Sequence, residues 1–423
     1  MHIVLATDNY WPRVSGMAVS VDTFAQEFRA AGHEVSILAP DYPGAQAQDL
    51  TCGRQGVFRF ASWRLFFSQE DRLVTLGAQK AVFALLDRLQ PDVVHVQTEL
   101  LMGRAAWRWA KRNQVPLVMT AHTHWETYIN HYLPFPPAFG RALARHIMRS
   151  VLGQAEVVVT PSEPMRQVLE QYGISRPIVV LPTGFQASAF AQIDRAHAKR
   201  DSYLFEKYPQ LRGRPVLLTV GRVAQEKNLE FLLQVVEQLV QEMPDLVWLL
   251  VGDGPSLAVL QKQVVDRGLA NHVVTTGYIC RDQVQHAYAL GDVFVLASET
   301  ETQGLATIEA LGSGLPVVAV DQMGSTAMLA GELGGFLVPA ELDTFACKVK
   351  ALLEDPLLWA CKASGALQTA KQWAPAQLSD KMLNVYQGVI EAHRQAARLL
   401  VGQTPVLASC ADRGAIAAQR LGR

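Results

Sequence analysis

The sequence lacks the features of a disulfide-stabilised, membrane-spanning or nucleic-acid-binding protein. Its five cysteines are scattered along 423 residues without a Cys-x-x-Cys pair, so reduced thiols are expected rather than a disulfide framework or a zinc site. No apolar run reaches the roughly 18 residues that a membrane-spanning helix needs. The 38 Lys and Arg balance 39 Asp and Glu, whereas nucleic-acid-binding proteins usually carry a positive excess. The start, MHIVLATDNYWP, predicts a strand rather than a signal peptide.

Short Val- and Ile-rich runs alternate with longer helical patterns through most of the chain. Runs that are apolar throughout are typical of parallel strands buried on both faces. The predicted strands are residues 2–8, 34–40, 92–97, 116–122, 157–162 and 178–182 in the first half, and 215–222, 247–254, 272–278, 293–298 and 316–320 in the second. The alternation predicts an α/β protein with two doubly wound, Rossmann-like domains in tandem.

A polar stretch without a strand pattern, residues 185–215, separates the two sets of strands. We expect a first domain over residues 1–190 and a second over residues 191–378. An amphipathic helix over about 379–398 is expected to pack back onto the first domain. The tail, residues 399–423, has few apolar anchors and is expected to be loosely held.

In doubly wound sheets, ligands bind beyond the carboxyl ends of the strands, so two facing domains would share one cleft. At one such end, Gly221 allows close approach to the backbone, and Arg222 and Lys227 supply two cations for an anion. A solvated surface pair is the alternative. The turn at Gly252 follows the next strand, and an ordinary strand-to-helix turn is an equally good interpretation.

A third strand end carries two carboxylates around a helix start. Gly304 precedes a helical pattern that begins at Leu305, so free backbone N–H groups would form an anion site there. Glu301 lies in the preceding loop and Glu309 lies inside the helix. Either carboxylate, taken alone, could be an ordinary solvated residue.

Together these motifs resemble the retaining glycosyltransferases of family four, which have the GT-B fold of two Rossmann-like domains facing across a cleft. The resemblance extends over nearly the whole chain. It is carried by Glu301-x7-Glu309, Gly221-Arg222 with Glu226-Lys227-Asn228, residues 312–318, Asp8 with Pro12 and Ser15-Gly16, residues 92–96, Ala121-His122-Thr123 and residues 181–184.

The resemblance implies a transferase that uses a nucleotide sugar, with a UDP-linked donor favoured, bound mainly by the second domain. Arg222 and Lys227 would hold the diphosphate, and Glu301 and Glu309 would bind the sugar and ribose hydroxyls. His122 would hydrogen-bond the sugar near the reacting carbon. The remaining donor-binding positions implied are Gly16, Gly221, Gly252, Tyr278 and the amides of Gln303, Gly304 and Leu305. We therefore predict catalytic roles for His122, Glu301, Arg222 and Lys227.

The chemistry needs positive charge where the sugar–phosphate bond breaks. One cation about 4 Å from an anion is worth about 4 kcal/mol at an effective dielectric of about 20. Two cations and a helix N-terminus would thus supply much of what Mg²⁺ would otherwise supply. No Asp-x-Asp follows a strand, so we predict neither a metal ion nor a cofactor beyond the nucleotide sugar. In the usual picture the leaving phosphate takes the acceptor proton, so Glu301 is neither base nor nucleophile.

The acceptor is expected on the first domain. The aromatic segment 121–136 resembles that of bacterial diacylglycerol glucosyltransferases, with Trp125, Tyr128 and Tyr132 as candidate contacts. Gln303 also favours a resemblance to the diacylglycerol glucosyltransferases, since many other members of the family have Phe at this position. The aromatic residues could instead pack the loop itself. His122 could instead be a buried core residue. His95 is interpreted as structural, and His124 and His131 are not assigned a role.

The first domain is locally basic. Between residues 51 and 149 there are 13 Lys and Arg against 6 Asp and Glu. Arg141, Arg145 and Arg149 fall on one helix face, which would suit an anionic membrane surface or an ordinary amphipathic surface helix. We expect a cytoplasmic enzyme, peripheral on the inner face of the plasma membrane, that transfers a hexose, with glucose favoured, to a lipid such as diacylglycerol. A soluble acceptor or polysaccharide precursor remains an alternative, as does a non-catalytic nucleotide-binding regulatory protein.

Overall fold

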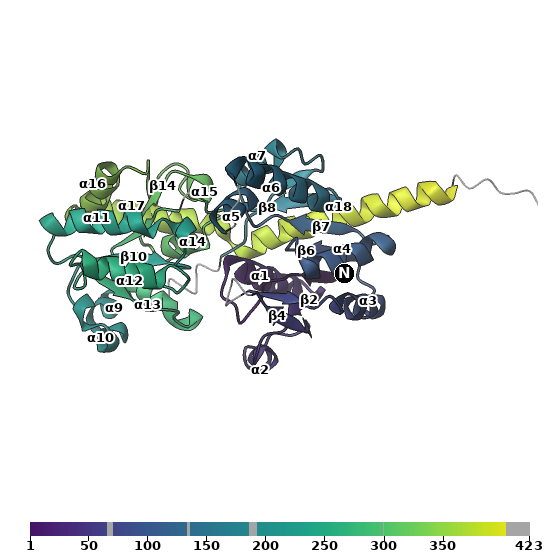
Figure 1. The fold of residues 1–423 in the computed structure, drawn as a ribbon, viewed down its shortest axis with the longest axis horizontal. Coiled ribbons are helices and arrows are strands. Elements are labelled where there is room, and N and C mark those ends of the chain that lie inside the picture. Colours follow the sequence, from purple (N-terminus) through teal and green to yellow (C-terminus); the bar gives the residue numbers. More distant parts are fainter. Residues whose placement is uncertain (66–70, 133–135, 186–192, 299, 403–423) are drawn as a thin grey trace, which may run out of the picture.

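The chain forms two lobes, each built on one parallel sheet, with a long helix that runs from one lobe across the other (Figure 1). The computed structural model describes residues 1–65, 71–132, 136–185, 193–298 and 300–402, without the side chains of 130–132, 281–282, 397 and 399–402. None of the helices in these ranges is both long and apolar enough to cross a bilayer. The two-domain α/β prediction is confirmed.

The N-terminal lobe contains a seven-stranded parallel sheet. Its order is β3 (Val57–Phe60), β2 (Glu34–Pro40), β1 (His2–Ala6), β6 (Val93–Val96), β7 (Leu117–Thr120), β8 (Val157–Thr160) and β9 (Ile178–Val180). The helices of this lobe are α1 (Gly16–Ala30), α2 (Ala45–Thr51), α3 (Ala78–Leu89), α4 (Leu101–Arg112), α5 (Trp125–Tyr132), α6 (Pro137–Leu152) and α7 (Glu163–Gln171). A short antiparallel pair, β4 (Ser62–Arg64) and β5 (Arg72–Val74), lies beside the sheet.

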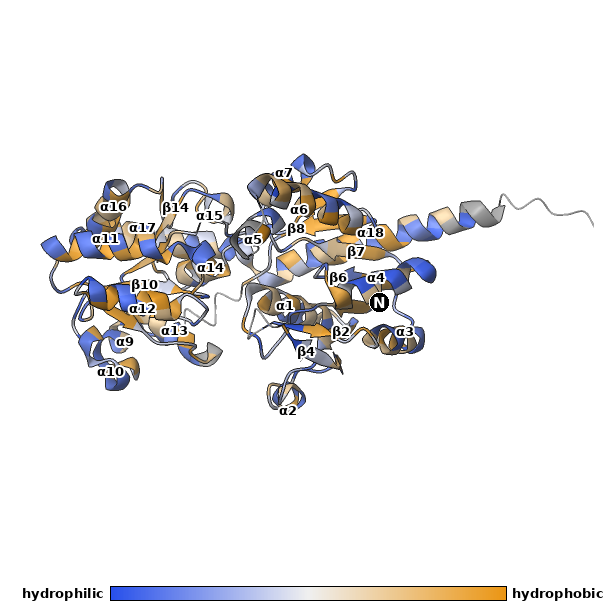
Figure 2. Ribbon diagram, viewed as in Figure 1, coloured by the Kyte–Doolittle hydropathy of each residue, from blue (hydrophilic) through white to orange (hydrophobic). Residues whose placement is uncertain are grey.

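Both faces of this sheet are buried, which explains the apolar runs in its strands. Val4 and Val94 pack on one side under α3, α4, α6 and α7. Ile3 and Val93 pack on the other side under α1 and the C-terminal helix. In Figure 2 the hydrophobic colour gathers on the strands and on the helix faces turned towards them. Alternate residues of each strand therefore belong to two separate hydrophobic cores, one on each face of the sheet.

The C-terminal lobe repeats this plan with a six-stranded parallel sheet. Its order is β12 (Val273–Thr275), β11 (Val247–Val251), β10 (Val216–Val220), β13 (Val293–Leu296), β14 (Val317–Val320) and β15 (Gly335–Val338). Its helices are α11 (Leu229–Glu242), α12 (Leu257–Asp266), α13 (Arg281–Leu290), α14 (Leu305–Gly312), α15 (Met323–Met328), α16 (Leu342–Glu354) and α17 (Pro356–Ala370), with the single turns η2 (Gln225–Lys227) and η3 (Lys371–Trp373). Residues that follow β7, β10 and β13 line one pocket, so the carboxyl ends of both sheets point towards the space between the lobes.

The chain crosses between the lobes twice, and the two crossings touch. Phe185 N donates to Trp373 O at 2.7 Å, and a side chain at Gly184 would bring its Cβ within 2.4 Å of Pro375 Cα. The first crossing leads to the short helices α9 (Arg195–Asp201), α10 (Leu204–Lys207) and η1 (Pro209–Leu211). The second leads to α18 (Pro375–Gly402), where Tyr386 is fully buried in the N-terminal core.

Sequence and structure differ at several elements. The strands β3 and β15 and the β4–β5 pair were not predicted. In β3, Arg59 interrupts the apolar run, but its guanidinium is buried against Asp49 at 2.8 Å. The last helix begins at Pro375 rather than near 379, because proline is well suited to a first helical turn. Helix α1 begins at Gly16 because Ser15 Oγ caps it, accepting from Ala18 N.

Candidate active site

A pocket lies between the two lobes, at the carboxyl ends of both sheets. The N-terminal lobe lines it with His122, Thr123, His124, Thr127 and Tyr128, and the C-terminal lobe with Glu226, Lys227, Thr300, Glu301 and Thr302. Four of the residues predicted from sequence, His122, Tyr128, Lys227 and Glu301, therefore line one cavity although they come from different domains. The shared cleft follows from the geometry of parallel sheets.

The cations at the end of β10 are each close to a carboxylate. Lys227 Nζ bonds to Glu301 Oε2, and both side chains keep about a fifth of their surface exposed, at 22% and 19%. Arg222 Nη1 lies 3.8 Å from Glu226 Oε1. Ser298 Oγ donates to Glu226 O at 3.0 Å, which ties this loop to the end of β13. In this structure both cations therefore lie beside carboxylates, in a place only partly open to solvent.

Gly252 is required for backbone packing at this edge. A Cβ at Gly252, whose φ is +143°, would lie 1.8 Å from Gly221 O, and Gly252 N donates to Gly277 O at 3.0 Å. Gly221 itself has a φ of +154°. The two glycines let the ends of β10 and β11 meet closely. Tyr278, just beyond Gly277, is 48% exposed.

Helix α14 starts at the cleft, between the two predicted carboxylates. Gly304 precedes it with a φ of +87°, and no side chain caps this end of the helix. Glu309 is buried inside the helix and accepts a hydrogen bond from the Tyr288 hydroxyl at 2.8 Å. From the other lobe, a Cβ at Gly16 would lie 3.4 Å from Leu305 Cδ1. The first loop of the N-terminal domain thus reaches the start of α14.

His122 lies just beyond β7. Its Nε2 is 2.8 Å from Gln97 Oε1, an acceptor, which assigns the ring proton to Nε2 and leaves Nδ1 as an acceptor. Burial lowers the pKa of His122 to about 4, so the ring is neutral near pH 7. His95, interpreted as structural, is buried on β6 with its two ring nitrogens 2.6 Å from the Tyr386 and Thr120 hydroxyls.

The candidate acceptor residues lie on α5. Trp125 and Tyr128 meet edge to face at 5.6 Å, and Tyr128 also lines the pocket. Arg141 of α6 donates to Glu126 at 2.8 Å and braces α5. The side chains of Tyr132 and His131 lie outside the described residues.

Sequence analysis placed Asp8 in a family motif without a role, and it missed the buried carboxyl group of Glu99 and the direction of one side chain. Asp8 accepts from Met102 N at 2.8 Å and so holds the start of α4. Burial raises the pKa of Glu99, at the end of β6, to about 7. Gln303 directs its side chain to Thr183 of the other lobe. Nothing local in the sequence signals these contacts, although its position after a strand would have flagged Glu99.

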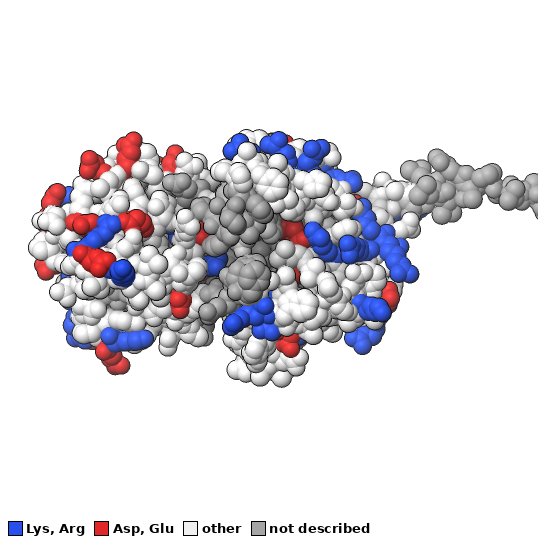
Figure 3. Space-filling view, viewed as in Figure 1, with Lys and Arg blue, Asp and Glu red and all other residues white. Residues whose placement is uncertain are grey.

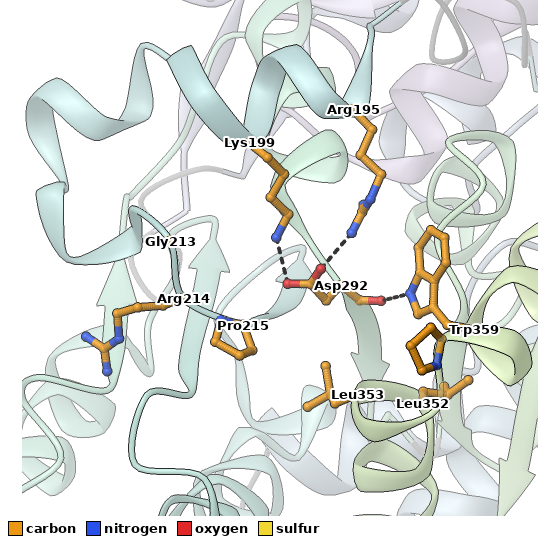
Figure 4. Close-up of a pocket in the computed structure, with 10 residues that line it drawn as sticks. Arg195, Lys199, Gly213, Arg214, Pro215, Asp292, Leu352, Leu353 and Trp359 are labelled. Carbon is orange, nitrogen blue, oxygen red and sulfur yellow. Dashed lines mark hydrogen bonds and ion pairs between the residues drawn. The ribbon is translucent and has the colours of Figure 1, made fainter.

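A second hollow lies at the opposite, amino end of the C-terminal sheet (Figure 4). There Arg195 and Lys199 of α9 converge on Asp292, at 2.7 and 2.6 Å. Trp359 Nε1 donates to Asp292 O at 2.7 Å. Because Asp292 already has these partners and also accepts from Val216 N at 2.8 Å, this cluster anchors α9 to the sheet.

Charge is unevenly distributed between the lobes. Figure 3 shows Lys and Arg gathered over the N-terminal lobe on the face in view, with Asp and Glu more frequent on the other lobe.

Within the described ranges, no group of three or more His, Cys, Asp or Glu side chains is arranged to hold a metal ion.

Two parallel-sheet domains with facing carboxyl ends define the GT-B class of glycosyltransferases, and solved structures agree with this fold. Anabaena HepE in complex with UDP and glucose aligns with a TM-score of 0.74 over 92% of this chain and 100% of its own, at 18% identity. Sucrose-phosphate synthase from Thermosynechococcus elongatus aligns with a TM-score of 0.73 over 92% and 99%, also at 18% identity.

Sequence comparison identifies the family. Residues 14–188 match the model of Glycosyltransferase Family 4, and residues 214–355 match that of Glycosyl transferases group 1. The alpha-monoglucosyldiacylglycerol synthase of Streptococcus pneumoniae is 28% identical over 84% of this chain and 79% of its own length. The enzyme of the same name from Acholeplasma laidlawii is 26% identical over 75% and 80%. The chain belongs to glycosyltransferase family 4, as its motifs predicted.

Proposed function

We propose that the protein transfers a hexose from a nucleotide sugar to a membrane lipid, with retention of anomeric configuration. UDP-glucose is the favoured donor and diacylglycerol the favoured acceptor. The observation that carries the proposal is that Lys227 and Glu301 of one lobe line the same pocket as His122 and Tyr128 of the other. The names of the two relatives above support glucose and diacylglycerol. Other relatives are named for GDP-mannose, including a Mycobacterium tuberculosis mannosyltransferase at 29% identity, so the donor must be tested directly.

The C-terminal lobe would bind the donor. Arg222, Lys227 and the amides at the start of α14 would neutralise the diphosphate as it departs, when its negative charge is largest. Glu309 would accept from the ribose hydroxyls and Glu301 from the sugar hydroxyls. Because Lys227 and Glu301 bond to each other, donor binding would exchange this contact for one with phosphate and one with sugar.

The N-terminal lobe would supply the other side of the reaction. Nδ1 of neutral His122 is an acceptor suited to a sugar hydroxyl beside the reacting carbon. The acceptor hydroxyl would attack the anomeric carbon from the face that the diphosphate leaves. The C–O bond to phosphate breaks, the new glycosidic bond forms, and the acceptor proton passes to the leaving phosphate. No step in this scheme requires a metal ion.

The lipid would be reached from a membrane surface. Arg145 and Arg149 of α6 and the basic residues of α4 would face anionic headgroups, each worth about 1 kcal/mol near the surface. Arg141 contributes less because it already pairs with Glu126. The four described cysteines are free and exposed, which favours a reducing compartment and thus the cytoplasmic leaflet.

The central test is a screen of nucleotide sugars against lipid extract, with products identified by mass spectrometry and anomers by NMR. We expect transfer of glucose from UDP-glucose to diacylglycerol with the α configuration retained. Glu301→Ala should abolish transfer while UDP binding persists, and Glu354→Ala, an exposed residue of the same lobe, should change neither. Transfer only to soluble sugars would refute the lipid acceptor, and UDP binding without any transfer would favour a regulatory protein.

Membrane association is tested separately by co-sedimentation with vesicles of phosphatidylglycerol and phosphatidylcholine. We expect binding that falls with salt and weakens in Arg145→Glu/Arg149→Glu. Lys262→Glu, on the exposed face of α12, changes charge on the other lobe and should leave binding intact. Equal binding by all three proteins would contradict the proposed surface.

A further inference from the structure

The side chain of Gln303 joins the two domains beside the donor site. Thr183 N donates to Gln303 Oε1 at 2.9 Å, and Gln303 Nε2 donates to Thr183 O at 2.9 Å. One carboxamide thus satisfies both backbone groups of a residue 120 positions away. Gln303 is only 6% exposed and Thr183 only 3%, so water has little access to either bond.

The bridge continues into the N-terminal lobe. The Thr183 hydroxyl donates to Ser20 Oγ at 2.7 Å, and Ser20 is buried on α1. Thr183 also directly precedes the crossing at Gly184 and Phe185, where the two interdomain segments touch. The bridge therefore lies next to the segments that cross between the lobes.

The other side of the same loop is held within the C-terminal lobe. Gly324 N donates to Glu301 O at 2.6 Å. A Cβ at Gly324 would lie 2.6 Å from Glu301 O and 2.8 Å from Gln303 N, so the loop packs directly on the start of α15. The loop from Glu301 to Gln303 is thus fixed from both lobes, and its position depends on how they meet.

We propose that Gln303 is a positioning residue whose side-chain amide clamps the Glu301 loop to the N-terminal lobe at Thr183. The clamp keeps the donor sugar, held by Glu301, correctly positioned relative to His122 and the acceptor side of the pocket. The side chain of Gln303 does not touch the substrate in this role. The inference rests on the proposed donor-binding role of Glu301.

Gln303→Glu provides a test because it preserves shape and makes the clamp depend on pH. A neutral carboxylic acid accepts through one oxygen and donates through the other, so it can make both bonds to Thr183. A carboxylate can only accept, and it would bring negative charge against the Thr183 carbonyl. Burial favours the neutral form. The variant should therefore work better at low pH than at high pH, relative to the wild type.

The experiment measures kcat and KM for the nucleotide sugar from about pH 6 to about pH 8. At pH 8 we expect Gln303→Glu to lower kcat at least about tenfold, with severalfold recovery of the variant-to-wild-type ratio at pH 6. Gln303→Met has similar size but cannot form the clamp, so it should be impaired at every pH. UDP affinity should change less than about threefold in both variants, because the side chain does not contact the nucleotide.

Gln322→Glu is the matched control, since Gln322 is an exposed glutamine just before α15. It should have wild-type activity at all pH values. A flat ratio for Gln303→Glu, or wild-type activity in Gln303→Met, would overturn the clamp while leaving the proposed function standing. If the wild type transferred no sugar, the proposed function would fail instead. Amide exchange at Thr183 then tests the clamp alone: faster exchange in Gln303→Met supports it, and unchanged exchange refutes it.

Discussion

Replacing Lys227 by alanine should slow sugar transfer by at least about tenfold, because this amine is proposed to neutralise the departing diphosphate. A charge about 4 Å from a phosphate oxygen is worth about 4 kcal/mol at an effective dielectric of about 20 and about 1 kcal/mol in water. Lys227 is 22% exposed, so its contribution lies between these limits. Those energies correspond to losses from several-fold to about a thousandfold, and partial burial favours the upper part of that range.

The pairing of Lys227 with Glu301 requires a second comparison. If Lys227 served only to hold Glu301, its removal from Glu301→Ala would have no further effect. If it binds diphosphate, UDP affinity should fall on Lys227→Ala in both backgrounds, although by different factors because Lys227 and Glu301 contact each other. Isothermal titration with UDP gives the affinities, and steady-state kinetics give kcat/KM for the single variants.

The control is Lys262→Ala, which removes the same charge from an exposed position on the same lobe. It should stay within about twofold of the wild type. Unchanged transfer in Lys227→Ala would remove the diphosphate role, and so would UDP affinity that is insensitive to Lys227 once Glu301 is absent.

Other predictions concern metal dependence and stability. EDTA should leave transfer largely intact, and full loss restored by Mg²⁺ would contradict the metal-free scheme. Tyr386→Phe should lower the free energy of unfolding by about 1–3 kcal/mol, because the buried His95 ring loses a partner; urea titration measures this, and no change would show that the bond adds nothing. Glu99→Gln should gain stability over the wild type as pH rises from about 4.5 to 7, because in that range the unfolded wild type has lost the Glu99 proton, whereas the folded wild type, in which burial raises the pKa to about 7, still holds it. The gain is at most about 3 kcal/mol, and equal values at pH 5 and pH 8 would refute it. Gly252→Ala should reduce both stability and UDP affinity because its Cβ would lie 1.8 Å from a backbone oxygen. Gly388→Ala, where the space is open, should do neither.

The sequence predicted the α/β class, the two domains and most of their strands. It did so because continuous apolar runs report burial on both faces of a parallel sheet. Where local pattern and burial disagree, the prediction failed. In β3, Arg59 is buried by pairing with Asp49, a contact that no window of neighbouring residues reveals. The family motifs also predicted which residues would gather at strand ends, and their individual roles stay predictions.

By itself, then, the sequence determined the order of most strands, the glycine-rich strand ends and the family, because these depend on residue type and short-range spacing. Only the tertiary structure decided which distant groups meet. The Lys227–Glu301 pair spans 74 residues, the Gln303–Thr183 bridge 120 and the His95–Tyr386 contact 291. Such contacts depend on how two separately folded sheets pack against each other and on where the last helix returns, and no local propensity encodes either.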